Sequence, residues 1–233
     1  MYKRQAVVST EGLQKKPSHL SFAEAAAYQV AYLTAYVALV RRGNLQAGET
    51  LLVHGASGGV GMAAVDIGKL LGATVIATGG SDAKLQRVLA YGADHVINTE
   101  HGFREQVKAL TGGRGADVIY DPVGGDIFDE STRCINFDGR LLIIGFTSGR
   151  IASVPTNIPL IKGFSVMGVR AGEYGRQFPE KGAENLQIIW DWVREKKTRP
   201  HVHAELPLSQ SVEGFRMLQQ REVIGKLVIC PDR

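Results

Sequence analysis

The sequence predicts an α/β protein built on a doubly wound, mostly parallel sheet of six strands. Between residues 50 and 169, short apolar runs alternate with longer stretches of helical character. This alternation is typical of parallel strands joined by helical crossovers. Glycines such as Gly72 and Gly92 stand where the helical stretches would end, as expected for helix C-termini. For such a sheet we expect the strand order 3-2-1-4-5-6.

The expected elements follow in chain order. Ser21 and Glu24 have the spacing of a capping box, so an alanine-rich helix is predicted to begin there. The six strands are expected at 51–54, 74–78, 95–97, 117–120, 140–144 and 164–169. The helices between them are expected at 59–71, 82–91, 102–110, 126–135 and 157–162. Further on we expect a helix around Leu186 to Val193, a strand at 202–206, a helix at 209–220 and a strand at 226–229.

Composition limits the classes of function. With 233 residues, of which 44% are hydrophobic, the chain can bury a full core. The formal charge of +4 comes from scattered basic residues, a pattern that does not indicate a nucleic-acid partner. Cys134 and Cys230 lack metal-site spacing and are expected to be free thiols in a cytoplasmic protein. No apolar run reaches the roughly 18 residues that a membrane span needs, and no secretory signal is recognised, so we expect no membrane association.

Three tyrosines, Tyr28, Tyr32 and Tyr36, recur every four residues and so form one stripe on the first helix. We expect this stripe to pack against a neighbouring domain. Stacking on a cofactor is the alternative.

The most informative stretch runs from Gly48 to Ala64, where a strand, a glycine-rich turn and a helix follow one another. Ala56, Gly58 and Gly61 match the dinucleotide-binding fingerprint G-x-G-x-x-G, with alanine at its first position. Position 56 is expected to turn out of the strand, Gly58 to admit a pyrophosphate and Gly61 to let the helix pack closely. The N-terminus of the helix supplies free amides and a positive dipole end to an anion.

The same residues also spell Gly55-x-Ser57-x-Gly59, the nucleophile elbow of serine hydrolases. Asp121 or Asp126 and His201 or His203 would complete the order of a catalytic triad. An elbow normally follows several strands, however, whereas helical sequence precedes Leu51. We therefore keep the hydrolase only as an alternative.

The end of the second strand favours NADP over NAD. An NAD site usually has an acidic residue there, but this strand ends in Gly79, Gly80 and Ser81. Ser81 can donate a hydrogen bond to a 2′-phosphate, and Lys84 can pair with its charge. Two other site types are disfavoured: the chain has neither Tyr-x-x-x-Lys nor a P-loop. His201 and His203 lack further ligands spaced for a metal.

Several motifs together resemble a known family. The fingerprint stretch, Ala31–Tyr36, Tyr91–Asp94, Asp121–Gly125 and Gly225–Val228 are similar to the zinc-independent quinone oxidoreductases of the medium-chain dehydrogenase/reductase superfamily, the relatives of zeta-crystallin. The resemblance covers nearly the whole chain after residue 5. It implies a Rossmann cofactor domain, NADPH-dependent reduction of a small quinone or conjugated carbonyl, and a possible homodimer. A nucleotide-binding module without turnover is a further alternative.

The resemblance also implies a cofactor site. Ser57, Gly58, Gly59 and Val60 would meet the pyrophosphate, and Gly80, Ser81, Lys84 and Thr99 would surround the adenosine phosphate. Gly145, Phe146 and Thr147 would border the nicotinamide together with Val169, Arg170 and Ala171. Thr99 departs from the Tyr or His that is commoner in the family, which puts adenine stacking in doubt. No residue is identified as a proton donor.

Members of this family begin with a GroES-like barrel of about a hundred residues, and this chain departs from that pattern. We expect residues 1–20 to be a remnant of that domain, with 1–5 foreign to it. Residues 21–200 would form the NADP-binding domain, and 201–233 would return to the barrel, so the chain is expected to be N-terminally truncated. In the zinc enzymes of the superfamily, a cysteine ligand stands where this chain has Val30, so no catalytic zinc is expected.

Overall fold

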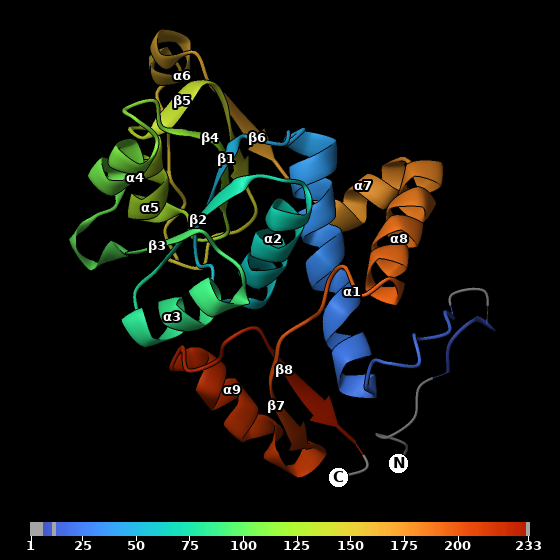
Figure 1. The fold of residues 1–233 in the computed structure, drawn as a ribbon. Coiled ribbons are helices and arrows are strands. Elements are labelled where there is room, and N and C mark those ends of the chain that lie inside the picture. The colour runs from blue at the N-terminus through green and yellow to red at the C-terminus, as the bar shows by residue number, and fades with distance from the viewer. Residues whose placement is uncertain (1–6, 11–12, 232–233) are drawn as a thin grey trace.

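The computed structural model describes residues 7–10 and 13–231. Its centre is a parallel sheet of six strands in the order β3-β2-β1-β4-β5-β6 (Figure 1), which confirms the predicted fold class and strand order. The strands are β1 (Thr50–Val53), β2 (Thr74–Gly79), β3 (His95–Asn98), β4 (Ala116–Asp121), β5 (Ile135–Ile143) and β6 (Ser165–Gly168).

Strand β1 lies at the middle of the sheet because it pairs with β2 on one side and with β4 on the other. Leu51, Leu52 and Val53 are all fully buried. A parallel strand covered on both faces is expected to be apolar at successive positions rather than at alternate ones. The direction of chain progression reverses beside β1, and ligands of doubly wound folds bind at that point.

Helices cover both faces of the sheet. One face packs against α1 (Phe22–Tyr36), α2 (Gly59–Leu70), α3 (Asp82–Tyr91) and α8 (Pro179–Arg194). The opposite face packs against α4 (Arg104–Leu110), α5 (Gly125–Ser131) and α6 (Asn157–Lys162). The remaining helices are α7 (Ala171–Gln177), α9 (Ser211–Gln219), the π-helix η2 (Val37–Arg42) that extends α1, and the 3-10 turns η3 (Thr99–His101) and η4 (Leu208–Gln210). Among the described residues, no helix combines the length and apolarity that crossing a bilayer requires.

The capping box is confirmed: the Ser21 side chain accepts from the Glu24 amide at 3.0 Å, and the Glu24 carboxylate accepts from the Ser21 amide at 2.8 Å. The expectation for the tyrosine stripe was wrong. Tyr28, Tyr32 and Tyr36 are buried inside this chain, where Tyr28 and Tyr36 pack against Trp190 and Trp192 of α8 with ring centroids 5.5 and 5.4 Å apart.

The largest differences from the predicted boundaries within the sheet lie between α5 and β5. Helix α5 ends at Ser131 rather than at residue 135, and β5 begins at Ile135 rather than at residue 140. The register shifts between the Ala116–Ile135 and Val118–Arg140 pairs, so Gly139, which directly precedes the predicted strand, lies within β5. Asp138, at φ +60, is part of this irregularity.

Strands β7 (Val202–Pro207) and β8 (Lys226–Cys230) form a separate parallel pair that lies with α9 beyond the end of α1 (Figure 1). Both strands were expected, and β8 pairs with β7; the return of this segment to a barrel stays a prediction. Val7 and Val8, in the segment expected to be a remnant of the barrel, are exposed and belong to no strand. Residues 1–6 lie outside the described residues.

Candidate functional site

The loops that follow β1, β2, β4, β5 and β6 share one edge of the sheet, because the carboxyl ends of parallel strands lie together. Backbone hydrogen bonds tie neighbouring loops to one another. The Ala56 amide donates to Thr78 O at 3.0 Å, and the Thr147 amide donates to Pro122 O at 3.1 Å. We call the loops Gly55–Gly61 and Gly79–Ser81 the glycine edge. Its first corner is the start of α2, and its second corner is the start of α3.

The glycine turn has the close backbone approach expected of it. A methyl group at Gly61 would lie 2.4 Å from Gly55 O and 2.8 Å from Ala56 Cα, distances that no real side chain tolerates. The role predicted for Gly61 is thus confirmed. The left-handed residue is Gly55 at φ +54, while Ala56 is fully buried. The turn out of the strand therefore occurs one residue earlier than predicted, and alanine fits the position after it.

The start of α2 is open to an anion. Gly58 is the N-cap, no side chain caps the helix and no acidic residue lies in its first turn. The first amides of a helix have no partner within the helix, and the helix dipole makes this end positive. The predicted residues Ser57, Gly58, Gly59 and Val60 all belong to this corner.

The start of α3 forms the second corner of the glycine edge. A methyl group at Gly80 would meet nothing within 4 Å, and the Ser81 side chain makes no capping hydrogen bond. The Lys84 ammonium donates to the carbonyl oxygens of Val223, at 3.1 Å, and of Arg221. Desolvation lowers the pKa of Lys84. The sequence placed Lys84 at this corner but gave no signal for its bonds to the segment before β8.

The predicted nicotinamide loops follow the neighbouring strands β5 and β6. A methyl group at Gly124 would lie 3.3 Å from the Phe146 ring, and 48% of the Phe146 side chain is exposed. The buried Val169 donates its amide to Ile143 O at 3.0 Å. Gly145 and Thr147 flank Phe146, Ala171 begins α7, and Arg170 is exposed. Thr99 opens the turn directly after β3 at the far end of the same edge.

A buried histidine that sequence reasoning missed stands directly before the glycine turn. His54 Nδ1 lies 2.7 Å from Thr78 Oγ1, and its Nε2 lies 2.8 Å from Ser131 Oγ. The Ser131 hydroxyl donates to Ile127 O, so Ser131 must accept from His54 Nε2–H, and Nδ1 accepts from Thr78. Desolvation lowers the pKa of His54 to about 3, so its imidazole is neutral. It joins the ends of β1 and β2 to α5.

Asp121, at the end of β4, has a structural role at this edge. Its carboxylate accepts from the amides of Val123 and Gly124 at 2.8 and 2.9 Å. Burial raises the pKa of this carboxyl group, and the two amide hydrogen bonds oppose that rise. Asp121 therefore fixes the Pro122–Gly125 loop against the glycine turn.

The geometry gives no support to a serine hydrolase. Within the described part of the chain, no hydrogen bond joins the Ser57 hydroxyl to a histidine, and Asp121 is bound to backbone amides. Among residues 7–10 and 13–231, no cluster of three or more His, Cys, Asp or Glu side chains could hold a metal. His203 Nδ1 instead accepts from the Ile224 amide at 3.4 Å.

Comparisons with known proteins identify relatives of the chain. Residues 59–187 match the family described as zinc-binding dehydrogenase. The chain is 37% identical to quinone oxidoreductase-like protein 2 homolog of Nematostella vectensis and to quinone oxidoreductase-like protein 2 of Bos taurus. Each match covers 97% of this chain, which spans 62% and 65% of the two relatives' own lengths.

Among solved structures, the chain resembles the Escherichia coli quinone oxidoreductase complexed with NADPH. The two are 31% identical with a TM-score of 0.84, over 93% of this chain and 67% of the other.

Proposed function

This chain belongs to the zinc-binding dehydrogenase family, and within the medium-chain dehydrogenase/reductases its relatives are quinone oxidoreductase-like proteins. From that premise we propose that it is an NADPH-dependent oxidoreductase that reduces a quinone or a conjugated carbonyl compound. The observation that carries the proposal is the uncapped start of α2, beside the strand at which the sheet order reverses.

The residues at the glycine edge fit a dinucleotide. The amides of Gly59 and Val60 lie in the first turn of α2, where the helix itself provides no acceptor for them. They would hold the pyrophosphate. Gly145–Thr147 and Val169–Ala171 would border the nicotinamide, with the Phe146 ring shielding it from water. When bound, NADPH supplies the hydride, and the protein's part is to orient the cofactor and the acceptor.

The second corner supports a preference for NADP(H). No carboxylate follows Gly79 to repel a 2′-phosphate, and Ser81 has a hydroxyl that caps nothing. A lysine ammonium has three N–H donors. Two of those of Lys84 are used by the carbonyls of Arg221 and Val223, which leaves one for phosphate. The two carbonyl oxygens would thereby hold the Lys84 ammonium group in position for the phosphate.

The test is a cofactor titration followed by turnover. NADPH is titrated while its fluorescence is followed, and a benzoquinone or an α,β-unsaturated ketone is then added while loss of reduced cofactor is recorded. We expect binding, and slow oxidation of NADPH with at least one of the two acceptors but not with a saturated ketone, because the barrel expected to form the other wall of the substrate cleft is not part of this chain. Binding without oxidation would favour a nucleotide-binding module. Absence of binding would overturn the proposal.

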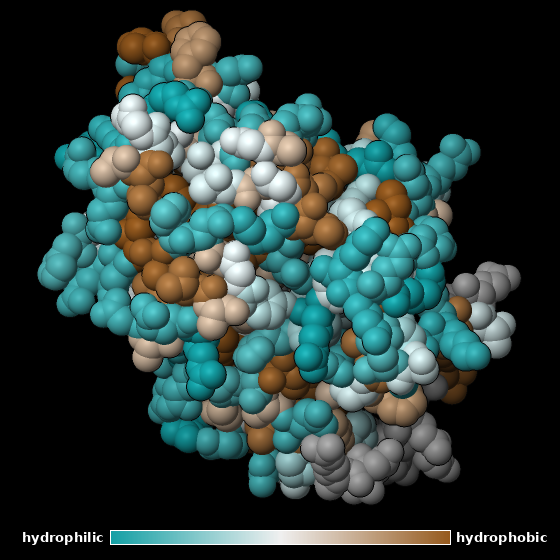
Figure 2. Space-filling model, viewed as in Figure 1, coloured by the Kyte–Doolittle hydropathy of each residue, from teal (hydrophilic) through white to brown (hydrophobic). Residues whose placement is uncertain are grey.

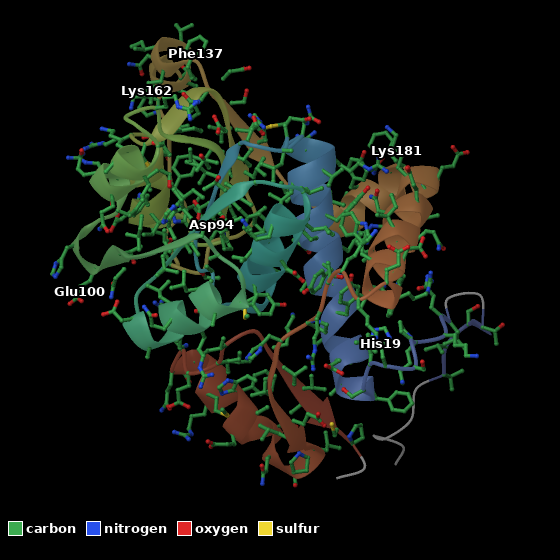
Figure 3. The ribbon with its side chains drawn as sticks, in the orientation of Figure 1. His19, Asp94, Glu100, Phe137, Lys162 and Lys181 are labelled. Carbon is green, nitrogen blue, oxygen red and sulfur yellow. The ribbon has the colours of Figure 1, made fainter. Side chains whose placement is uncertain are left out.

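We further propose that the chain forms a homodimer through the edge of the sheet at β6. This strand is the last in the order, so one side of it is unpaired, and open edges invite pairing. Phe137, Leu160 and Ile161 beside it are 78%, 82% and 73% exposed. Figure 2 shows apolar surface at the end of the molecule where Figure 3 labels Phe137. Light scattering after gel filtration should give a dimer for the wild type and a monomer for Leu160→Asp.

A further inference from the structure

Four elements of the chain meet around one partly buried carboxyl group. Asp66 lies in α2, with Tyr32 of α1 and Tyr91 of α3 beside it. The fourth element is the connection between α8 and β7, which contributes the backbone of Arg199. We call these four residues the Asp66 junction.

The Tyr32 hydroxyl makes two short contacts with other oxygen atoms of the junction. Its oxygen lies 2.6 Å from Asp66 Oδ2 and 2.7 Å from the carbonyl oxygen of Arg199. The Tyr91 hydroxyl lies 3.1 Å from the Tyr32 hydroxyl and also donates to Arg199 O. The Arg199 amide donates to Asp66 Oδ2 at 3.1 Å. The carboxyl group and the Arg199 backbone are thus joined both directly and through Tyr32.

The number of available protons decides the state of the carboxyl group. A phenolic hydroxyl has one proton, so Tyr32 can donate to Asp66 or to Arg199 O but not to both. Contacts as short as these two need a proton between the oxygen atoms, and a carbonyl oxygen carries none. Tyr91 cannot supply it, because its contacts are with Tyr32 and Arg199 O. The missing proton therefore belongs to Asp66, which donates to Tyr32 while Tyr32 donates to Arg199 O.

No cation of the junction or its neighbours compensates a charge on Asp66. Among the residues that the structure describes, no Lys, Arg or His side chain forms an ion pair with it. The neighbouring charged and titratable groups have other contacts: the Arg199 guanidinium pairs with Glu24 at 3.1 Å, Lys69 pairs with Asp94 at 2.7 Å, the His201 ring packs edge-on against Tyr91, and the Lys226 stem lies beside Gly59.

Burial acts in the same direction as the proton count. It raises the pKa of Asp66, and the hydrogen bonds from Tyr32 and from the Arg199 amide oppose that rise. Burial also raises the pKa of Tyr32 and of Tyr91, so both phenols keep their protons at neutral pH. The adjacent Tyr28, stacked on Tyr32, has a raised pKa for the same reason.

We propose that Asp66 holds a proton at neutral pH and that the uncharged carboxyl group fastens the connection between α8 and β7 to α1 and α2. Ionisation at higher pH leaves too few protons for the two contacts of Tyr32, so one of them opens and the connection loosens. The same connection supports β8, because His201 O accepts from the Lys226 amide at 3.0 Å. The junction is thus a pH-sensitive link between the six-stranded sheet and the β7–β8 pair, and it is independent of the proposed oxidoreductase activity.

The first test is urea unfolding of wild type and Asp66→Asn at several pH values. Asparagine has a similar size and can donate to Tyr32 at every pH. An aspartate in an unfolded chain titrates at about pH 3.9, so above about pH 5 only the folded wild type holds this proton. One such proton raises the unfolding constant about tenfold per pH unit. The ratio of the wild-type unfolding constant to that of Asp66→Asn should therefore rise by about a hundredfold between about pH 5 and pH 7.

Asp94→Asn is the matched control. The Asp94 carboxylate pairs with Lys69 at 2.7 Å, and it is ionised in both the folded and the unfolded chain over this range. The corresponding ratio should therefore stay constant. His54 and the other carboxyl groups titrate in all three proteins, so their contributions cancel. A constant ratio for Asp66→Asn as well would overturn the proposal.

A measurement on the wild type alone covers the case in which Asp66→Asn does not fold. In isotope-labelled protein, the assigned Asp66 Cγ resonance should keep the chemical shift of a protonated carboxyl group at neutral pH and should move at higher pH. Hydrogen exchange of the β7 amides, corrected for intrinsic rates, should accelerate over the same pH interval. An ionised Asp66 at neutral pH would overturn the proposal. Exchange that does not follow the Asp66 titration would overturn the loosening of the connection.

Discussion

The two corners of the glycine edge are built in different ways. At the start of α2, the backbone itself sets the geometry, since Gly55 takes the left-handed turn and Gly61 touches the backbone of residues 55 and 56. At the start of α3, the backbone is open around Gly80. Its geometry comes instead from a side chain, because Lys84 reaches carbonyls that lie far along the chain.

The difference shows which contacts a sequence can reveal. A backbone contact leaves a local trace, because only glycine tolerates the close approach and the left-handed φ. A bond from Lys84 to Arg221 O leaves none, since every residue type offers the same carbonyl. The turn at the first corner was predicted to within one residue. At the second corner the sequence predicted which residues are present, but not the contacts that hold them.

The largest effect is expected from a pair of matched glycine substitutions. Gly61→Ala places a methyl group against backbone atoms that cannot move aside, so we expect a loss of about 1–3 kcal/mol in the free energy of unfolding and a large loss of NADPH affinity. Gly80→Ala meets no atom within 4 Å and should change stability by less than about 0.5 kcal/mol. Denaturant unfolding of both variants measures the contrast. Equal losses would remove the distinction between the corners.

A second experiment sharpens the contrast at the level of the ligand. We expect NADPH to bind at least several-fold more tightly than NADH, because contacts to a charged phosphate contribute about 1.5–3 kcal/mol. The double variant Lys84→Ala with Ser81→Ala should lose most of this preference while NADH binds as before. Fluorescence titration of both cofactors at one ionic strength gives the ratio. A preference that survives the double substitution would place 2′-phosphate recognition elsewhere.

Much of the fold followed from local patterns. The family resemblance and the sheet order are confirmed. Both could be predicted because strands such as β1 carry continuous apolar runs and because glycines mark the helix ends. The failures involve partners distant in sequence. Tyr28 contacts residues 189 and 198, and helical periodicity shows that a stripe is buried without showing what buries it. The roles of the individual cofactor residues remain predictions.

A third prediction tests whether the first corner, where backbone contacts set the geometry, also depends on His54. Burial lowers the pKa of His54 from 6.5 to about 3. Between these values the unfolded chain binds a proton that the folded chain does not, so the free energy of unfolding falls as the pH falls below about 6.5. This one group contributes a slope of up to about 1.4 kcal/mol per pH unit.

The control for this effect is His54→Gln, which keeps polar atoms near Thr78 and Ser131 but does not titrate. Urea unfolding of both proteins at several pH values between about 7.5 and 5 should show a steeper fall for the wild type. Carboxyl groups titrate in both proteins, so only the difference in slope is informative. Parallel curves would mean that His54 is not held neutral.

The smallest effect concerns the tyrosine stripe, which like Lys84 is fixed by bonds that span the chain. The Tyr28 hydroxyl donates to Ile189 O and also lies 2.7 Å from Thr198 Oγ1. Tyr28→Phe leaves these buried groups without that partner and should lower the free energy of unfolding by about 1 kcal/mol.

Tyr36→Phe is the matched control, because no hydrogen bond of the Tyr36 hydroxyl occurs among the described residues, and its ring contact with Trp192 is preserved. It should change stability by less than about 0.5 kcal/mol. Thermal or denaturant unfolding of the two variants measures the difference. If Tyr28→Phe is as stable as Tyr36→Phe, the stripe is held by apolar packing alone. Side-chain hydrogen bonds to distant residues would then fix the start of α3, but they would not fix the tyrosine stripe of α1.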